Sequence, residues 1–197
     1  MATVASNPTQ QRIFDVAESI IARKGFSAVG INEVLQAAEV PKGSFYHYFA
    51  SKDAFGTALL EHYFKGYFKE MDLILQSPRA TAFDALMSYW QLWIRNQTSQ
   101  TDCGKCLAVK LGAEVADLSE QMRLALHRGT SQITDRLEVA IARGVDEGSV
   151  KIAASPRQVA MRLYAQWLGA SVMVKITRTT QPFDEALLQT RLTLNNL

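Results

Sequence analysis

The chain has 197 residues, of which 48% are hydrophobic, and it carries a formal net charge of +2 at pH 7. This length and apolar content can form a sizeable core in one or two small domains, while so small a net charge excludes binding that rests on overall charge. The sequence has no apolar run long enough to cross a membrane and no apolar signal core at its N-terminus. We therefore expect a cytoplasmic protein with no membrane partner.

The first predicted helix begins at Thr9 or Gln10 and ends at Gly25. Glycine is common just after the end of a helix, and the two preceding basic residues suit the negative end of the helix dipole. The apolar side chains recur at helical spacing: Ile13, Val16, Ala17, Ile20 and Ile21. We expect this helix to support the segment that follows it.

Residues 30–52 hold two short helical patterns that meet at a tight turn. The apolar stripe of the first is formed by Ile31, Val34, Leu35 and Ala38. Pro41 interrupts that pattern, because it lacks a backbone donor and disfavours a helical residue before it, and a second helix can begin there. Phe45 and Phe49 predict the core-facing side of this second helix. Such a pair forms a helix-turn-helix, whose second helix fits the major groove of double-stranded DNA.

The run PKGSFYHYFASKDAF, which starts at Pro41, resembles the signature of the TetR family of bacterial repressors. The resemblance implies an all-α protein that binds an inverted-repeat DNA operator as a homodimer. Candidate contacts to bases or phosphates are Lys42, Gly43, Ser44 and His47, and candidate phosphate-positioning residues are Tyr46, Tyr48 and Lys52. Asn32 of the preceding helix joins this predicted interface.

Two details qualify the predicted interface. Many members of the family have glycine at the turn, where this chain has Glu39, so Glu39 is mildly strained if the position needs a positive φ. The first 56 residues hold five Lys or Arg and five Asp or Glu. DNA affinity must therefore come from local placement, with Lys42 and Lys52 near the groove.

A long helix is predicted from Ser51, a plausible N-cap, to about Leu75, and another from about residue 80 to residue 96. We expect a helix-turn-helix domain over residues 1–52 and a helical regulatory and dimerisation domain over residues 53–197. In the resembled family the long helix joins the two parts. The regulatory pocket of the second domain is predicted from its aromatic side chains: Trp90, Trp93, Tyr164 and Trp167.

Cys103 and Cys106 form a C-x-x-C with several interpretations. A zinc site needs further ligands at matching spacing, and the three histidines are isolated, so we expect no metal and no cofactor. A thioredoxin-like couple needs a βαβ pattern, which is missing from the sequence. The remaining interpretations are a small buried side chain at a helix start and a reactive sensor thiol. Lys105 and Lys110 lie close to Cys106 in sequence and favour its thiolate.

The stretch from Cys106 to Ser119 also resembles a TetR branch that responds to electrophiles and oxidants through a cysteine at this place. That resemblance implies that Cys106 senses the signal, that Cys103 is a resolving partner or incidental, and that Lys175 projects its amine toward Cys106. Lys175 can equally extend to solvent from a helix end. The effector is then a small molecule or a reactive electrophile.

The last third of the chain predicts three helices. Asp117 and Glu120 have the spacing of a capping box for a helix from about Ser119 to Asp146. The next helix, opened by Ser155 and Pro156, is apolar nearly all round, which favours burial by self-association, with Gly169, Ala170 and Ser171 allowing close approach. A last amphipathic helix begins at Pro182.

Two functions follow from these patterns. The first is a homodimeric transcriptional repressor, which is not an enzyme and leaves its operator when the second domain receives a signal. The alternative is an all-helical C-x-x-C thiol reductase similar to alkylhydroperoxidase D. That chemistry normally needs a nearby histidine, and Leu107, Ala108, Val109 and Lys110 after Cys106 include none.

Overall fold

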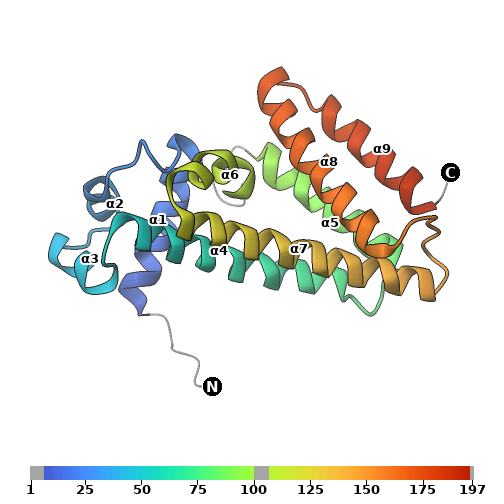
Figure 1. Ribbon diagram of the computed structural model, residues 1–197, viewed down its shortest axis with the longest axis horizontal. Coiled ribbons are helices and arrows are strands. Elements are labelled where there is room, and N and C mark those ends of the chain that lie inside the picture. The colour runs from blue at the N-terminus through green and yellow to red at the C-terminus, as the bar shows by residue number, and fades with distance from the viewer. Residues whose placement is uncertain (1–6, 100–106, 196–197) are drawn as a thin grey trace. The chain divides into compact units, whose positions relative to one another are not determined.

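The computed structural model describes residues 7–99 and 107–195, and within these ranges the chain folds into nine helices and no strand (Figure 1). The all-α fold predicted from the sequence is confirmed. None of the helices in the described ranges is both long and apolar enough to span a membrane. The chain forms two compact units, residues 1–65 with 100–128 and residues 66–99 with 129–197. The boundary predicted after residue 52 stays a prediction.

Helix α1 (Pro8–Lys24) starts close to its predicted position and ends at Gly25. Asn7 caps it by accepting a hydrogen bond from the backbone N–H of Thr9 at 2.9 Å. Gly25 has φ +88°, a conformation that side chains rarely adopt, and its N–H donates to the carbonyl of Ile21. The predicted apolar stripe faces inward at Ile13, Ala17, Ile20 and Ile21.

Helices α2 (Ile31–Ala37) and α3 (Lys42–Tyr48) form the predicted helix-turn-helix pair. Glu39 in the turn has φ +53°, so the position does need the left-handed conformation. The backbone N–H of Val40 donates to the carbonyl of Leu35 at 2.9 Å, which closes the turn. Pro41 is the N-cap residue of α3, as its fixed φ favours.

Helix α4 (Lys52–Leu75) begins after Ser51, whose hydroxyl accepts a hydrogen bond from the N–H of Ala54 at 3.0 Å. The predicted N-cap is therefore confirmed. Helix α5 (Ala82–Thr98) begins two residues later than predicted, because Thr81 caps it by accepting from the N–H of Asp84. Helix α6 (Leu107–Leu118) follows the segment that contains both cysteines.

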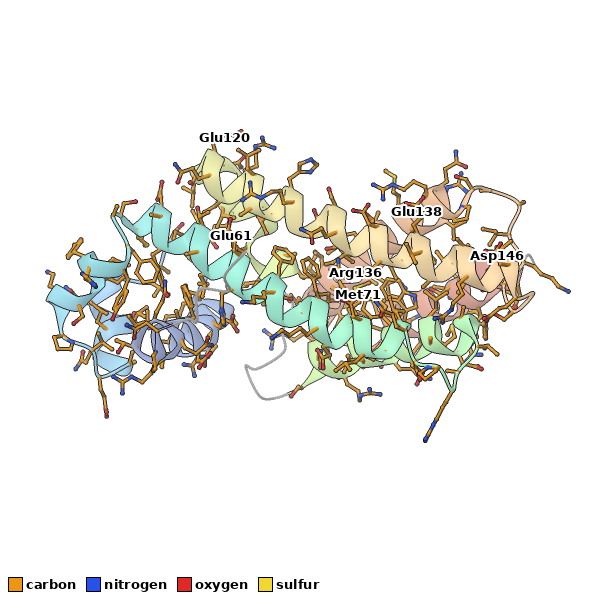
Figure 2. The ribbon with its side chains drawn as sticks, turned by 90° about the horizontal axis from the view of Figure 1, so that it is seen from below. Glu61, Met71, Glu120, Arg136, Glu138 and Asp146 are labelled. Atoms are coloured by element: carbon orange, nitrogen blue, oxygen red, sulfur yellow. The ribbon has the colours of Figure 1, made fainter. Side chains whose placement is uncertain are left out.

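Helix α7 (Glu120–Asp146) corrects one detail of the predicted capping. Asp117 lies inside α6, and the side chain that meets the start of α7 is Ser119, whose hydroxyl is 3.5 Å from the backbone nitrogen of Met122. Two helices separated by one residue leave no room for a capping box at Asp117. The labels of Glu120, Glu138 and Asp146 trace the course of α7 in Figure 2.

Helices α8 (Pro156–Thr177) and α9 (Gln181–Asn195) lie side by side in the second compact unit (Figure 1). The capping box at the start of α8 joins Ser155 and Gln158. Buried polar pairs join α8 to α5 and to α9. The indole N–H of Trp93 in α5 donates to Ser171 at 2.9 Å, and that of Trp167 donates to Thr190 of α9 at 3.0 Å. These bonds satisfy indole groups that would otherwise be costly to bury.

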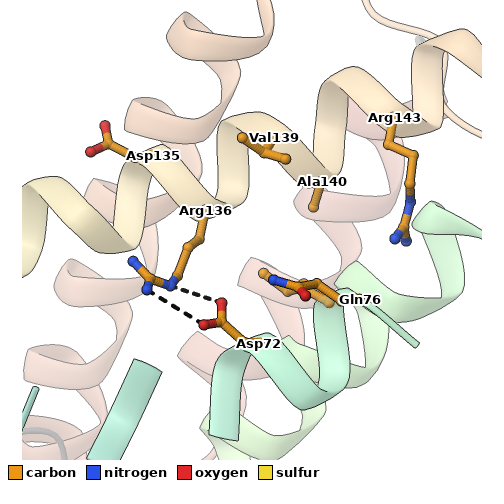
Figure 3. A pocket seen from close by; sticks show the side chains of 8 residues that line it. Asp72, Gln76, Asp135, Arg136, Val139, Ala140 and Arg143 are labelled. Carbon is orange, nitrogen blue, oxygen red and sulfur yellow. Dashed lines mark hydrogen bonds and ion pairs between the residues drawn. The ribbon is translucent and has the colours of Figure 1, made fainter. Parts of the chain in front are cut away.

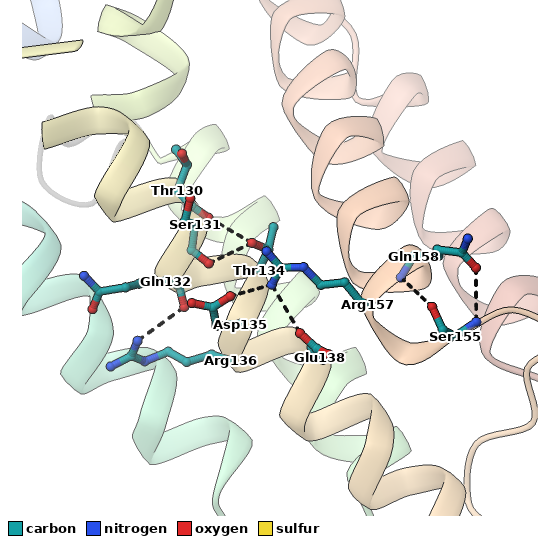
Figure 4. A network of polar contacts seen from close by, with 10 residues as sticks. All are labelled: Thr130, Ser131, Gln132, Thr134, Asp135, Arg136, Glu138, Ser155, Arg157 and Gln158. Atoms are coloured by element: carbon teal, nitrogen blue, oxygen red, sulfur yellow. Dashed lines mark hydrogen bonds and ion pairs between the residues drawn. The ribbon is translucent and has the colours of Figure 1, made fainter. Parts of the chain in front are cut away.

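A polar network joins α7 to the start of α8 (Figure 4). The guanidinium of Arg157 donates to the carboxylates of Asp135 and Glu138, the latter at 3.2 Å. On the other side of α7, Arg136 forms a two-pronged bond with Asp72 of α4, at 2.8 and 3.4 Å. These contacts fix α7 to two neighbours within one unit.

The outer face of α8 is apolar and exposed in the single chain, and its predicted burial by self-association stays a prediction. In the single chain, its exposed apolar side chains are Met161, Val172, Met173 and Ile176. Of the small residues expected at a close approach, only Gly169 is exposed, whereas Ala170 and Ser171 are buried within the chain. The expected close approach through Ala170 and Ser171 is wrong, because Ser171 is bonded to Trp93.

Replacing Glu39 with glycine should stabilise the protein by about 0.5–1 kcal/mol, because glycine adopts a positive φ without the steric cost that other residues carry. Urea denaturation of both proteins measures the change. The same Glu→Gly replacement at exposed Glu70 inside α4 is the matched control, and it should destabilise by about 1 kcal/mol. A loss of stability at both positions would contradict the assigned strain.

Candidate nucleic-acid interface

Helix α3 turns a polar side outward and an aromatic side inward. Phe45 and Phe49 are only 1% and 3% exposed, as predicted from their spacing. Tyr46 is 61% exposed. Among the other predicted contact residues on α3, Lys42, Gly43 and His47 are exposed. Ser44 and Tyr48 are half-buried. The structure therefore brings these six residues onto or beside one open helix face.

A cluster of aromatic rings packs against the buried side of α3. The ring centroids of Phe45 and Phe49 lie 5.1 Å apart, and that of Phe55 in α4 lies 5.5 Å from Phe45 and 5.1 Å from Phe49. Phe14 of α1 reaches Phe49 at 5.6 Å. A seven-residue helix is too short to be stable alone, so these contacts hold it in place.

Ring contacts also orient the exposed aromatic side chains of α3. Tyr46 meets Phe45 edge-on, with centroids 5.4 Å apart and planes at 89°. His47 meets Tyr48 at 5.2 Å and 75°. An aromatic side chain held by a neighbouring ring loses less conformational freedom when it contacts a ligand. The block from Tyr46 to Tyr48 is thus partly preorganised.

Lys52 and Asn32 lie beside α3 rather than on it. The amine of Lys52 is 3.4 Å from the carbonyl oxygen of Ser27 and 5.0 Å from the ring centroid of Phe26. In the structure it therefore fastens the start of α4 to the segment between α1 and α2. Asn32 is exposed in the first turn of α2. The phosphate contact of Lys52 and the DNA contact of Asn32 stay predictions.

Two titratable side chains of the helices have shifted pKa values, Glu18 of α1 and His62 of α4. Burial and the nearby charge of Asp15 raise the pKa of Glu18 to about 7. Burial lowers the pKa of His62, whose ring stacks on Phe14 at 4.8 Å and whose Nε2 is 3.0 Å from the amide nitrogen of Gln11. Near neutral pH Glu18 is therefore close to the point where it changes charge.

Helix α6 contributes residues that sequence reasoning did not place near the helix-turn-helix. The carboxylate of Glu114 accepts hydrogen bonds from the backbone N–H groups of Phe26 and Ser27. The amine of Lys110 donates to the carbonyl of Arg23 at 3.2 Å, at the end of α1. Pairs 87 or 88 residues apart leave no periodic signal in the sequence, so only the tertiary structure reveals them. The role predicted for Lys110, near Cys106, stays untested.

The predicted sensing residues are only partly covered by the structure. Cys103 and Cys106 lie outside the described residues. Lys175 lies in the last turn of α8, where it is exposed. Its predicted approach to Cys106 stays a prediction. In the described ranges, no group of three His, Cys, Asp or Glu side chains could hold a metal ion.

The four aromatic residues of the predicted effector pocket form one buried cluster. Trp90 and Trp167 stack with centroids 4.6 Å apart and planes at 8°, and Trp93 meets Tyr164 edge-on at 6.1 Å. All four are at most 5% exposed. The indole nitrogen of Trp90 is buried and has no hydrogen-bond partner in the described part of the chain. An acceptor on a bound effector could use this donor.

A separate cavity of about 300 Å³ lies between the end of α4 and α7 (Figure 3). The Asp72–Arg136 ion pair forms part of its wall, and Leu75, Val139 and Ala140 supply apolar lining. None of the four aromatic residues of the predicted pocket lines it. The structure thus offers a second place where a small molecule could bind.

Two family models match the chain. Residues 13–65 match "Bacterial regulatory proteins, tetR family", and residues 82–189 match "Tetracyclin repressor-like, C-terminal domain". The first match contains α2 and α3 with their aromatic support. The second begins at the first residue of α5 and ends within α9.

Known relatives are similar over nearly the whole chain. The HTH-type transcriptional repressor NemR of Escherichia coli (strain K12) is 38% identical over 179 residues, which cover 91% of this chain and 90% of the relative. The HTH-type transcriptional repressor DhaR of Mycobacterium sp. (strain GP1) is 29% identical over 93% of this chain and 91% of the relative. The crystal structure of E. coli NemR in its reduced form has a TM-score of 0.91, at 37% identity and with 97% and 99% of the two chains covered.

Replacing Glu18 with glutamine should raise Tm near pH 8 and change it little near pH 4.5. A carboxyl whose pKa is raised on folding, here from 4.5 to about 7, favours the folded state at low pH and loses that contribution as the pH rises through about 7. Glutamine stays neutral and so avoids the cost of a buried charge at high pH. Thermal unfolding at both pH values, with exposed Glu70→Gln as control, measures the difference. An equal change at both pH values would refute the assigned pKa.

Proposed function

This chain belongs to the TetR family and is a DNA-binding transcriptional repressor, and we propose that it acts as a cytoplasmic homodimer which a chemical signal releases from an inverted-repeat operator. The observation that carries the proposal is the open polar face of α3 on its aromatic support. Its relatives are transcriptional regulators, and they give no support to the alternative of a thiol reductase.

In the proposed interface, some residues read the base sequence and others position the protein on the DNA backbone. Lys42, Ser44 and His47 lie in or beside the exposed face of α3 and would meet base edges in the major groove. Tyr46 and Tyr48, together with Gly43 at the N-terminal turn, would meet the phosphates or sugars. Phosphate contacts supply affinity that falls with salt, whereas base contacts supply the choice of sequence.

The proposed homodimer uses the outer face of α8. The exposed residues Met161, Gly169, Val172 and Ile176 follow one another at steps of eight, three and four residues, so they share one stripe of the helix. Leu188 of α9 is 51% exposed and adds to the apolar surface. Apolar surface of this kind is covered when two copies associate, and a twofold dimer presents two α3 helices to two half-sites.

The proposed signal is an electrophile or oxidant that reacts at Cys106. Support comes from the resemblance of residues 106–119 to the electrophile-sensing branch and from NemR, a relative whose crystal structure is described as a reduced form. Release then follows from linkage. The modified dimer favours a geometry that binds the operator less well, and the ratio of the two affinities sets the size of the response.

The proposed sensing mechanism predicts the outcome of an operator titration with and without a mild electrophile or hypochlorite. Fragments of the DNA upstream of the gene should bind the wild type, and the reagent should weaken that binding. The Cys106→Ser variant should bind the operator as well as wild type and keep its affinity after treatment, because serine lacks the thiolate that reacts. Cys103→Ser serves as the control for the neighbouring thiol. A variant as sensitive as wild type would show that sensing does not need Cys106.

The proposed role of Lys42 predicts a change in base preference. Replacing Lys42 with alanine should relax the preference at one position of each half-site, with a loss of discrimination of about 1–3 kcal/mol. Binding to a library of operator variants measures it, and Lys69→Ala, an exposed change on α4, is the control. A uniform loss across all sequences, with a salt dependence reduced by about one phosphate contact, would reassign Lys42 to the DNA backbone.

A further inference from the structure

The contact between Glu114 and the segment after α1 is the starting point. The carboxylate of Glu114 accepts one hydrogen bond from the backbone N–H of Phe26 at 3.1 Å and another from that of Ser27 at 2.7 Å. Each carboxylate oxygen therefore takes one of two consecutive amides. Hydrogen bonds to an ionised group are about twice as strong as those between neutral groups.

The backbone at Gly25 makes this approach possible. Gly25 has φ +88°, which turns the chain at the end of α1 toward the carboxylate. A Cβ atom at this position would lie 2.9 Å from Oε2 of Glu114, closer than real Cβ contacts allow. Glycine therefore serves both the conformation and the close approach.

The charge of Glu114 is maintained by its surroundings. Burial would raise its pKa, but the hydrogen bonds from Ser27 and Phe26 and the nearby charge of Lys110 outweigh that effect and bring the pKa below its ordinary value. The group is thus ionised at neutral pH, when the acceptor is strongest. Lys110 adds its own hydrogen bond to the carbonyl of Arg23.

The segment so held leads directly into the helix-turn-helix. Phe26 is 4% exposed, and Val29 is 2% exposed just before α2 begins at Ile31. From the other side, the amine of Lys52 reaches the carbonyl of Ser27. The entry to α2 is therefore fixed between α6 and the start of α4, all within one compact unit.

We propose that Glu114 is a positioning residue for operator binding. Its side chain holds α2 and α3 at the orientation that two half-sites require. The proposal rests on the proposed function, because operator affinity reports it. Glu114 itself is assigned no contact with DNA. It acts through the backbone amides of Phe26 and Ser27, so its loss alters the angle of the helix-turn-helix and leaves the exposed face of α3 unchanged.

A merely local role for Glu114 makes a different prediction. If the two hydrogen bonds only strengthen the fold, their loss lowers the affinity for a single half-site and for the full operator alike. A positioning role lowers affinity for the full operator alone, because only there must two copies of α3 fit a fixed spacing. The single half-site is measured at low salt, where weak binding is detectable.

The test compares Glu114→Gln with wild type and with Glu70→Gln, an exposed glutamate on α4 that serves as the matched control. Glutamine keeps the size of the side chain, but its amide nitrogen cannot accept a hydrogen bond. Glu114→Asp, which keeps the charge and is one methylene shorter, gives a second variant if the first folds poorly. Circular dichroism and Tm confirm the fold, and amide hydrogen exchange at Phe26 and Ser27 reads the contact without DNA.

We expect faster exchange at both amides in Glu114→Gln, full-operator affinity about 10-fold weaker, which is about 1.4 kcal/mol, and half-site affinity within about 2-fold of wild type. The full-operator affinity of Glu114→Asp should lie between those of wild type and Glu114→Gln. Equal losses on half-site and full operator, or no loss on either, would overturn the positioning role. Failure of wild type to bind any upstream fragment is distinguishable, since it defeats the proposed function while the exchange at Phe26 and Ser27 still reports the contact.

Discussion

The packing of Phe45 and Phe49 against Phe14 and Phe55 is the interaction on which the proposed interface depends. A seven-residue helix forms too few internal hydrogen bonds to persist in water, so α3 exists because its two phenylalanines are buried. The same burial fixes which residues point outward. Helical spacing then places Lys42, Tyr46 and His47 on the open side. The net charge of the chain, +2, contributes little to this proposed interface.

The N-terminal unit adds a second constraint, which is the fixed path between α1 and α2. Gly25 turns the chain, Glu114 accepts hydrogen bonds from two of its amides, and Lys52 holds the carbonyl of Ser27 from α4. This arrangement makes α6 part of the support for the helix-turn-helix, although its residues are distant in sequence. A sensing event close to α6 would therefore lie near the helices of the proposed interface.

The second unit has hydrogen-bonded tryptophans in its interior and an exposed apolar stripe on α8. Trp93 and Trp167 donate their indole N–H groups to Ser171 and Thr190, and Arg157 joins α7 to α8. The two indole bonds are buried, so each of these donors has a partner away from water, whereas the Arg157–Asp135 pair is exposed. The exposed stripe on α8 contrasts with this interior, and a second copy of the chain is the proposed cover.

The sequence by itself determined the helical class, the caps at Ser51 and Ser155 and the inward side of α3. Those features depend on neighbours along the chain: Ser51 and Ser155 cap the helices that follow them, and Glu39 was identifiable as a strained turn residue because one position departs from a familiar pattern. The tertiary structure alone decided which distant groups meet. It joined Glu114 to Phe26, because hydrogen bonds between residues 88 apart leave no trace in local periodicity. Helical spacing could not decide which small residues of α8 face inward, since burial there follows from partners on other helices.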